Sequence, residues 1–451
     1  MTQEPRTTEH LSRFVSQARW DDIPAEVRHD ARRALVNYFA AALGGCKDAA
    51  VDIACTALRP FQPGDAATLI GRGMRADILH GARLNAMSAN ALDFDDTHFP
   101  TIIHPSAPVA AALFALAEAR PVSGRDLLLA FVLGVETACR LGRAVSPVHY
   151  ERGWHITATC GVFGAAAATC KALGLDGTST LWALGHASAT ASGLVHNIGT
   201  MSKNIGIGNA ASNGLMSGLL AAGGFSGPDE PLDGPHGYLQ VSSAHPPASD
   251  AIAGALGATW ELSANTYKPY PCGIVLNPVV EACLALTREG GLAAGQVEQV
   301  TVTGHPLLLQ RADRPFVTTG REAQVSAQHA VAAALARGAA GIDEFSDAAV
   351  RDPVLVEIAG KVRMEEDAGY DIGSVTVRVS TRDGSERSRH IEHAYGGLER
   401  PLSDADLERK FFTLHRHGGS TCRPEPLLSA LWDLDNRDDA GAIVRMASGS
   451  D

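Results

Sequence analysis

The hydrophobic pattern of this 451-residue chain changes near residue 265, and this change constrains the fold more than any other feature. Before it, apolar residues recur three and four positions apart, which is the spacing of one helix face. One segment begins at Asp22, ends at Gly44, and has apolar positions at Val27, Ala31, Ala34, Leu35, Tyr38 and Phe39. The chain has 46 glycines and only 6% aromatic residues, which favours close helix packing through small side chains. We therefore expect residues 1 to about 262 to be helical throughout.

After residue 265, strands become the expected elements. Apolar and polar residues alternate at 297–303 and 374–380, as they do in a half-buried strand. Arg382–Ser385 has the composition of a tight turn. Residues 387–393 are therefore expected to return as the second strand of a hairpin.

Helices are expected between and after these strands. Helical spacing recurs at 327–337 and 353–362. A further helix is expected after Ser403, because Asp406 completes a capping box with it. The chain is also longer than one typical domain core. The sequence therefore predicts a mostly α protein, with a large helical domain and a smaller α+β domain.

Composition excludes several classes of partner. The formal net charge is −12 without any Lys/Arg run, so we expect no nucleic-acid partner. No apolar stretch reaches the roughly 20 residues of a membrane span, and we expect no membrane partner. The first ten residues lack the features of a signal peptide, and the eight cysteines show no CxxC spacing. We expect a cytoplasmic protein without disulfides or a zinc site.

Three carboxylates are crowded between two Ala-rich segments. Asp93, Asp95 and Asp96 are followed closely by Thr97 and His104. Like charges repel, and each resists burial unless it is paired, so folding alone gains nothing from this crowding. Such groups are tolerated where they contact a ligand, a metal or one another's protons. A solvated acidic turn that caps the next helix is the alternative interpretation.

Three further segments place a histidine or lysine before an apolar run. His155 precedes a small-residue helix, Lys203 precedes a glycine-rich one, and Lys268 precedes the run from Ile274 to Leu286. Free N–H groups and the dipole at a helix start favour an anion. The alternatives are a structural histidine at 155 and a surface lysine at 268.

Together these four segments resemble the MmgE/PrpD family over most of the chain. The residues that carry the resemblance are Asp93, Thr97, His104, His155, Lys203 and Lys268. The family includes 2-methylcitrate dehydratases, cis-aconitate decarboxylases and iminodisuccinate epimerases. The resemblance implies a helical domain of residues 1–262 and 404–451, with an α+β lid domain at 266–400 and the Lys268 segment at the hinge. It also implies a homodimer formed through the helical domain.

The resemblance further implies a small anionic di- or tricarboxylate as substrate. Removing a proton or CO₂ next to a carboxylate builds up charge, which Lys203 and Lys268 are suited to offset. His104 and His155 are the expected acid and base, since histidine titrates in the right range. Asp93 is expected to orient an imidazole. The expected substrate-binding residues are Lys203, Lys268, Thr97, Cys272 and His329, with a core thiol as the alternative for Cys272.

No cofactor is expected. Gly206 and Gly208 do not have the spacing of a dinucleotide loop, and no strand precedes them, so they indicate close helix packing. Asp95 and Asp96 are possible cation ligands, but the nearby histidines are not at metal-ligand spacing on a helix. We therefore expect activity without a bound metal.

Two departures from the family leave the reaction open. Asn277 stands where many relatives have a histidine, and His329 stands where cis-aconitate decarboxylases have a tyrosine. The seven-residue step from Thr97 to His104 is more similar to that of the epimerase, which has serine in place of Thr97, than to that of the decarboxylase. These features argue against a standard decarboxylase but do not select a substrate. We expect a lyase that dehydrates or decarboxylates a small polycarboxylate. The alternative is an isomerase that removes a proton and returns it on the opposite face.

Overall fold

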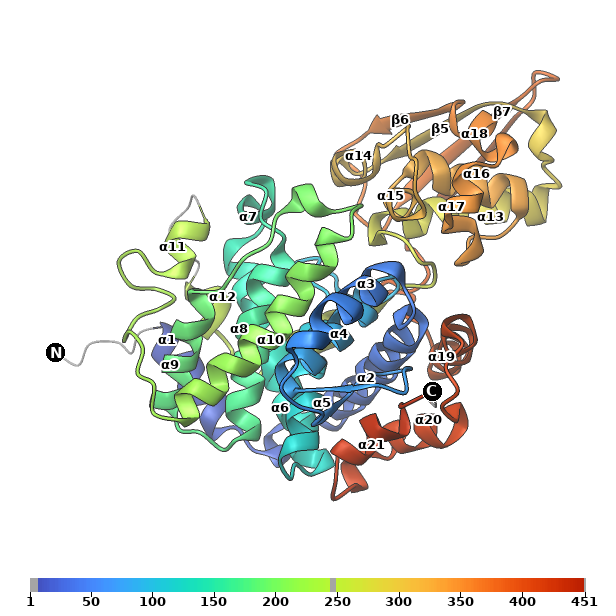
Figure 1. Ribbon diagram of the computed structural model, residues 1–451. Helices are drawn as coiled ribbons and strands as arrows, with labels where there is room; N and C mark the ends of the chain where they lie inside the picture. Colours follow the sequence, from blue (N-terminus) through green and yellow to red (C-terminus); the bar gives the residue numbers. More distant parts are fainter. Residues whose placement is uncertain (1–6, 244–248, 450–451) are drawn as a thin grey trace.

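The computed structural model describes residues 7–243 and 249–449. Helices dominate its first part, and they pack side by side below the smaller upper body in Figure 1. They are α1 (Thr7–Gln17), α2 (Ala25–Gly45), α3 (Ala49–Leu58), α4 (Ile78–Asn90), α5 (Ser106–Ala119), α6 (Gly124–Val145), α7 (Val148–Glu151), α8 (Ile156–Ala172), α9 (Gly177–Ser188), α10 (Ser202–Ala222), α11 (Tyr238–Ser242) and α12 (Ser249–Ala253).

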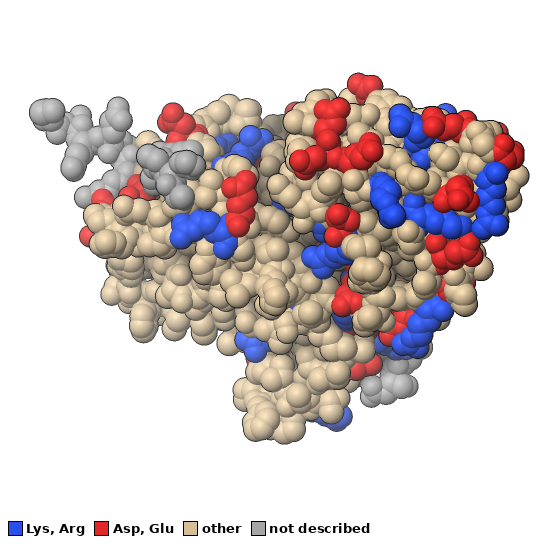
Figure 2. All heavy atoms as spheres, turned by 90° about the horizontal axis from the view of Figure 1, so that it is seen from above, with Lys and Arg blue, Asp and Glu red and all other residues tan. Residues whose placement is uncertain are grey.

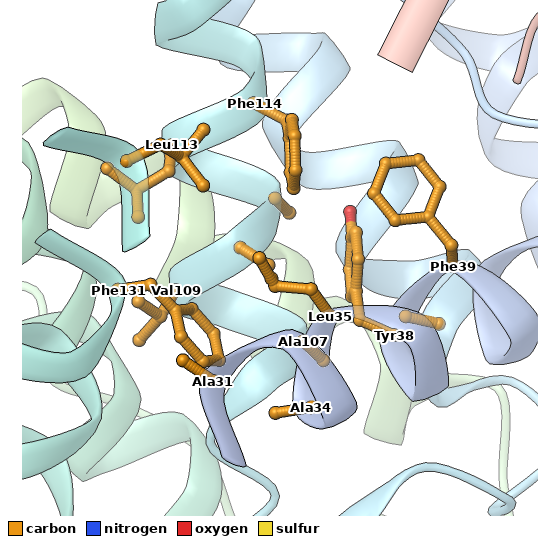
Figure 3. Close-up of a cluster of buried hydrophobic side chains, with 14 of the residues drawn as sticks. Ala31, Ala34, Leu35, Tyr38, Phe39, Ala107, Val109, Leu113, Phe114 and Phe131 are labelled. Carbon is orange, nitrogen blue, oxygen red and sulfur yellow. The ribbon is translucent and has the colours of Figure 1, made fainter. Parts of the chain in front are cut away.

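The core of the helical part forms where α2 meets α5. Tyr38 and Phe39 of α2 lie against Phe114 of α5, with Phe131 of α6 nearby in the same cluster (Figure 3). The rings of Phe39 and Phe114 meet edge to face, with centroids 4.9 Å apart. The apolar face expected between Val27 and Phe39 is therefore buried here.

Small residues set the spacing between α8 and α10. A Cβ atom on Gly214 would lie 2.4 Å from Ala165 Cβ, and one on Gly208 would lie 2.9 Å from the Arg83 carbonyl oxygen of α4. Neither distance leaves room for a side chain. The interpretation as close helix packing is confirmed for Gly208, whereas a Cβ atom on Gly206 would meet only Ala158 Cβ, at 3.2 Å.

The smaller body contains a four-stranded sheet in the order β6-β5-β7-β8. Its strands are β5 (Val297–Gly304), β6 (Val362–Glu366), β7 (Val375–Thr381) and β8 (Glu386–Ile391). Strands β7 and β8 form the expected hairpin, with Gly384 at φ 85° in the turn. The helices of this body are α13 (Asn277–Gly290), α14 (Pro306–Ala312), α15 (Gly320–Ala323), α16 (Ala327–Arg337), α17 (Asp347–Val350) and α18 (Pro353–Ala359).

The chain then returns to the helical body (Figure 1). Helix α19 (Asp404–Gly418) packs along α2, and α20 (Pro424–Trp432) and α21 (Gly441–Met446) follow it. Ser403 and Asp406 form the expected capping box. One hydrophobic cluster joins these helices to α2, α5 and α6, whereas a separate cluster fills the smaller body. This separation supports our proposed boundaries at 262–266 and 400–404; residues 1–6, 244–248 and 450–451 lie outside the described residues.

Short strands interrupt the first part, so the expectation of helix throughout was wrong in detail. Strands β1 (Ala67–Thr68) and β2 (Arg75–Ala76) pair with each other, and β3 (Asp96–His98) pairs with β4 (Asn265–Tyr267). Sequence patterns miss such strands because two or three residues are too few to show alternation.

Among residues 7–243 and 249–449, no helix combines the length and apolar character that a membrane span requires. On the face shown in Figure 2, acidic and basic side chains are interspersed and form no large basic patch.

Candidate active site

The pairing of β3 with β4 brings the acidic segment and the Lys268 segment together. The ladder is antiparallel, with Asp96 opposite Tyr267 and Thr97 opposite Thr266. Lys268 follows the last paired residue of β4 and therefore meets the residues just before β3. It does not lie at a helix start, because α13 begins only at Asn277, and the expected helix dipole behind Lys268 was wrong.

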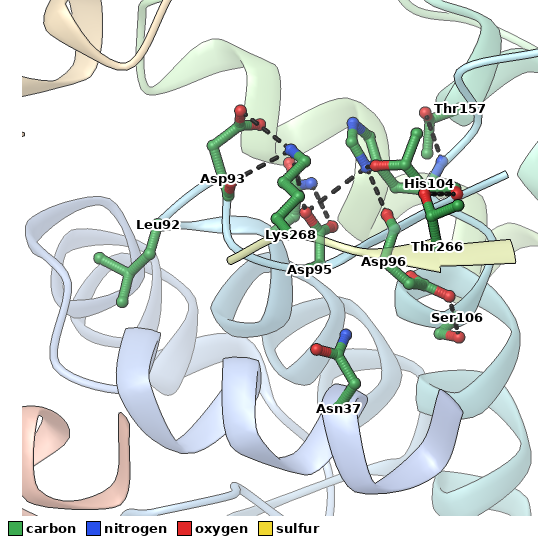
Figure 4. A network of polar contacts seen from close by, with 12 residues as sticks. Asn37, Leu92, Asp93, Asp95, Asp96, His104, Ser106, Thr157, Thr266 and Lys268 are labelled. Carbon is green, nitrogen blue, oxygen red and sulfur yellow. Dashed lines mark hydrogen bonds and ion pairs between the residues drawn. The ribbon is translucent and has the colours of Figure 1, made fainter. Parts of the chain in front are cut away.

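Asp93 lies between the two lysines of the site. Its backbone is left-handed, with φ 50°, a conformation that aspartate tolerates better than most residues. Lys203 Nζ lies 2.5 Å from Asp93 Oδ1, and Lys268 Nζ lies 3.1 Å from Oδ2 (Figure 4 shows the Lys268 contacts). Burial raises the pKa of Asp93, but Lys203 and Lys268 outweigh burial and hold that pKa well below its usual value. The carboxylate is therefore ionised.

The two lysines come from different parts of the chain. Lys203 is in the first turn of α10, and Lys268 follows β4, where its side chain is 1% exposed. Both ammonium groups nevertheless converge on one carboxylate. Among the residues that line the pocket here, two cations face one carboxylate, an arrangement that suits a further anion. Asp93 itself was expected to orient an imidazole, but it pairs with the lysines instead.

His104 is oriented by the acidic segment through a different residue. Its Nδ1 lies 2.7 Å from the carbonyl oxygen of Asp96 and 3.5 Å from Oδ1 of Asp95. A carbonyl oxygen only accepts hydrogen bonds, so Nδ1 carries the proton and Nε2 keeps the lone pair. Burial lowers the pKa of His104 although Asp95 opposes this. A neutral imidazole of fixed tautomer results.

Asp95 is buried, and only one of its two carboxylate oxygens accepts a hydrogen bond from the described residues. Its Oδ2 accepts a hydrogen bond from Asn90 Nδ2 at 2.6 Å, while Oδ1 makes no hydrogen bond to the described residues. That oxygen lies 3.9 Å from Lys268 Nζ as well as near His104. From the sequence, Asp95 was expected only as one of three crowded carboxylates and as a possible cation ligand. Its position between an imidazole and an ammonium group became visible only with the β3–β4 register.

His155 is the N-cap residue of α8. Its backbone N–H donates to the Gly193 carbonyl at 3.0 Å, which fixes the turn before the helix. Burial, with the nearby charge of Lys203, lowers the pKa of His155 to about 3. Like His104, His155 is therefore neutral at pH 7.

These side chains line one pocket between the helical and the α+β body. Its empty space, including the open mouth, is about 640 Å³. The expected catalytic residues all line it: Asp93, His104, His155, Lys203 and Lys268. The α+β body contributes Arg311 and Arg314, and α7 contributes Tyr150. These three residues were not expected from the sequence, because no motif marks them and their approach depends on how the two bodies pack.

Ile102 forms part of the pocket wall with a strained backbone. Its φ is 60°, which is rare for a β-branched residue. The side chain packs against the apolar cluster of the α+β body, and the Ile102 N–H donates to the His98 carbonyl at 2.8 Å. Such strain is tolerated where surrounding contacts determine the conformation, as they do at this contact between the bodies.

Three expected substrate-binding residues lie outside the described lining of the pocket. The Thr97 hydroxyl lies 3.2 Å from His104 Nδ1 and so supports the imidazole. Cys272 is buried, and burial raises the pKa of its thiol, so the thiol stays neutral. His329 Nε2 contacts the Glu344 carbonyl at 2.7 Å. Asn277 begins α13 directly after the pocket-lining Leu276.

Further polar residues hold the residues of the site in place by hydrogen bonds. Ser106 and Asn265 donate to the carboxylate of Asp96, and burial raises the pKa of Asp96 to about 6. Lys410 of α19 donates to the Lys268 carbonyl at 2.9 Å and to Asn37 Oδ1 at 2.8 Å. Helix α19 therefore holds the backbone of a pocket lysine.

Asp93, Asp95 and His104 offer the site's candidate set of metal ligands. One ligand atom from each lies within 4.8 Å of the others. However, both oxygens of Asp93 already contact ammonium groups, whose positive charge repels a divalent cation. The arrangement therefore fits a carboxylate substrate better than a metal ion.

Comparison with known protein families agrees with this geometry. The model of the MmgE/PrpD N-terminal domain matches residues 9–251, and that of the C-terminal domain matches residues 270–434. The chain belongs to the MmgE/PrpD family. The second match runs through α19 and α20, although these helices pack on the helical body.

Curated relatives cover most of the chain. It is 29% identical to the human (Homo sapiens) cis-aconitate decarboxylase over 385 residues, which are 82% of this chain and 79% of that protein. It is 26% identical to the cis-aconitate decarboxylase of Aspergillus terreus over 469 residues, covering 97% of this chain and 95% of that protein. The similarity therefore spans both bodies and the pocket between them.

Proposed function

We propose that the protein is a cofactor-independent lyase that decarboxylates or dehydrates a small di- or tricarboxylate similar to cis-aconitate or 2-methylcitrate. The observation that carries this proposal is the meeting of two lysines and two neutral histidines in one buried pocket. The relatives named cis-aconitate decarboxylase support the same reaction class.

The lysines provide the electrostatic part of the reaction. When a proton or CO₂ leaves the carbon next to a carboxylate, the electron pair moves into that carboxylate and makes it enolate-like. Lys203 and Lys268 are positioned to stabilise this charge, because their combined charge exceeds that of Asp93. Burial strengthens the effect, since the surrounding medium screens charge poorly.

The histidines provide the proton transfers. His104 has a free lone pair on Nε2, so it can act as a base without first losing a proton. A substrate with several carboxylates raises the pKa of a nearby imidazole, which favours its protonated form during the reaction. In decarboxylation, the C–C bond breaks, CO₂ leaves, and an imidazolium protonates the carbon. In dehydration, one imidazole takes the proton from the carbon next to a carboxylate. The other imidazole, in its protonated form, protonates the departing hydroxyl, which leaves as water.

Epimerisation is the second candidate, and one observation favours it. His104 and His155 come from different segments yet line the same pocket. One histidine would remove the proton next to a carboxylate and the other would return a proton from the opposite face. This reaction needs no leaving group, whereas the lyase reactions do.

The test is incubation in D₂O with cis-aconitate, 2-methylcitrate and chiral dicarboxylates, followed by NMR. A lyase gives CO₂ or new alkene signals, and a decarboxylated product carries deuterium at the carbon that takes up the proton. An epimerase introduces deuterium into substrate that is otherwise unchanged. The Lys268→Ala variant, purified in the same way, controls for contaminating activity. Absence of all these changes with the wild-type protein would reject the proposed function.

A further inference from the structure

Arg311 is a partly buried cation that none of the steps above uses. It is the penultimate residue of α14, in the α+β body, and its guanidinium lies 4.0 Å from the centre of the Tyr150 ring of α7. The contact therefore bridges the two bodies at the pocket, which both residues line.

The guanidinium of Arg311 lacks an acidic partner among the described residues. Its buried Nε makes no hydrogen bond there, and none of the ion pairs between residues of 7–243 and 249–449 includes it. Other arginines of the same body do have carboxylate partners, namely Arg321, Arg337, Arg378, Arg382, Arg389 and Arg400. A desolvated cation without a counterion is costly, so a site of this kind suits an anionic ligand.

The stacking on Tyr150 also sets the geometry. A guanidinium that lies over an aromatic ring keeps its plane fixed while its N–H edge stays free. That edge matches the two oxygens of a carboxylate. Lys203 and Lys268 come from the helical body and the connection after β4, so Arg311 faces the pocket from the other body.

We propose that Arg311, held by Tyr150, binds a second carboxylate of the substrate and thereby selects polycarboxylates over monocarboxylates. This inference rests on the proposed function, since it assigns the far end of the same substrate. Arg311 acts as a specificity-determining residue, and binding of that carboxylate joins the α+β body to the substrate.

The test measures binding by calorimetry, without turnover. The probes are tricarballylate, glutarate and butyrate, which carry three, two and one carboxylates. Arg311→Met is expected to weaken tricarballylate binding about 10- to 150-fold, the usual effect of losing hydrogen bonds to a charged group, and to change butyrate binding less than about threefold. Arg311→Lys keeps the charge but loses the two-pronged contact, so an intermediate loss is expected. Arg363→Met, at an exposed arginine of β6, is the control and should bind all three probes normally.

Equal weakening of tricarballylate and butyrate by Arg311→Met would overturn the assignment. Unchanged tricarballylate binding, or no binding of it by the wild-type protein, would overturn it as well. The proposed function fails separately: Arg311-dependent binding without any turnover in D₂O supports the arginine site and rejects the lyase and epimerase. Turnover of a polycarboxylate with unchanged kcat/KM in Arg311→Met supports the function and rejects the arginine site.

Discussion

At the scale of residues, the site depends on how three charges are balanced. Asp93 sits between Lys203 and Lys268, so each lysine is held in place by an anion before substrate arrives. A carboxylate that met free lysines would have to order both long side chains, which costs conformational entropy. The internal carboxylate reduces this cost, and at the pocket wall the two ammonium groups still outnumber it.

Lys203→Ala and Lys268→Ala are each expected to lower kcat/KM by about 30- to 5000-fold. Loss of one ammonium group leaves a desolvated substrate carboxylate unpaired, at about 2–5 kcal/mol in the transition state. Steady-state kinetics, with circular dichroism to verify folding, measures the effect. Lys361→Ala, at a lysine of the α+β body outside the pocket, is the matched control. Near-normal kinetics for either pocket variant would remove that lysine from the reaction.

Treatment with EDTA is expected to leave activity unchanged. The ammonium groups on Asp93 disfavour a divalent cation at the Asp93, Asp95 and His104 cluster, and the proposed chemistry uses only side chains. Activity before and after chelation, with and without added Mg²⁺ or Fe²⁺, tests this. Full loss on chelation that is restored by one of these ions would contradict it.

The residues of the site could be predicted from the sequence where a local motif contained them. His104, His155 and the two lysines each stand in a short polar segment, and all of them line the pocket. Their partners were harder to predict. The contacts of Asp95 depend on the register of two short strands, and the stacking of Arg311 on Tyr150 depends on how two bodies pack. Neither leaves a periodic signal in the sequence.

At the scale of secondary-structure elements, segments with a clear hydrophobic period were predicted correctly, and segments with a weak one were not. The helix expected at 327–337 has those bounds, and the β7–β8 hairpin turns at the expected residues. Strand β6 was missed because it is an edge strand with three charged residues among its five, so its apolar positions are sparse. The expected helix at 353–362 accordingly ends earlier, at Ala359.

The close contact of α8 and α10 gives a prediction about stability. Gly214→Ala places a Cβ atom 2.4 Å from Ala165 Cβ and 2.7 Å from the Val162 carbonyl oxygen. The helices must move apart, so a loss of about 1–3 kcal/mol in the free energy of unfolding is expected. Gly206→Ala is the control in the same helix, because its nearest contact is 3.2 Å and alanine improves helix propensity by about 1 kcal/mol. Urea denaturation measures both, and equal stability of the two variants would contradict the packing argument.

Helix α19 gives a prediction about pH. Burial lowers the pKa of Lys410 from 10.5 to about 7, so between these values the unfolded chain binds more protons than the folded protein. The contribution of Lys410 to stability therefore rises with pH through that window. The stability of the wild type relative to Lys410→Met is expected to increase from pH 7 to pH 9.5. Lys47→Met, at an exposed lysine, is the control. In thermal unfolding, a stability difference between the wild type and Lys410→Met that does not change with pH would contradict the lowered pKa of Lys410.

At the scale of the whole molecule, the charge of the pocket is opposite to that of the protein. The chain carries a net charge of −12, yet four cationic side chains and one carboxylate line the pocket, while both its histidines are neutral. A small anion is therefore repelled by much of the molecular surface and attracted at the pocket. Salt weakens both effects, but least in the buried pocket. The net charge alone was readable from the sequence; the local reversal needed the fold.

The last prediction is that two copies associate through the helical body. Met201 and Ile205 are 42 and 52% exposed, and they lie one turn apart on the same side of the chain as α10 begins. Apolar groups gathered in this way favour a covered surface. Light scattering at micromolar concentration is expected to give the mass of a dimer, and Met201→Asp combined with Ile205→Asp is expected to shift it toward the monomer, because charges resist burial in an interface. Phe61→Asp, at a residue that is 76% exposed elsewhere on the helical body, should leave the mass unchanged. A monomeric wild type would refute the dimer, and a dimeric double variant would place the interface on another face.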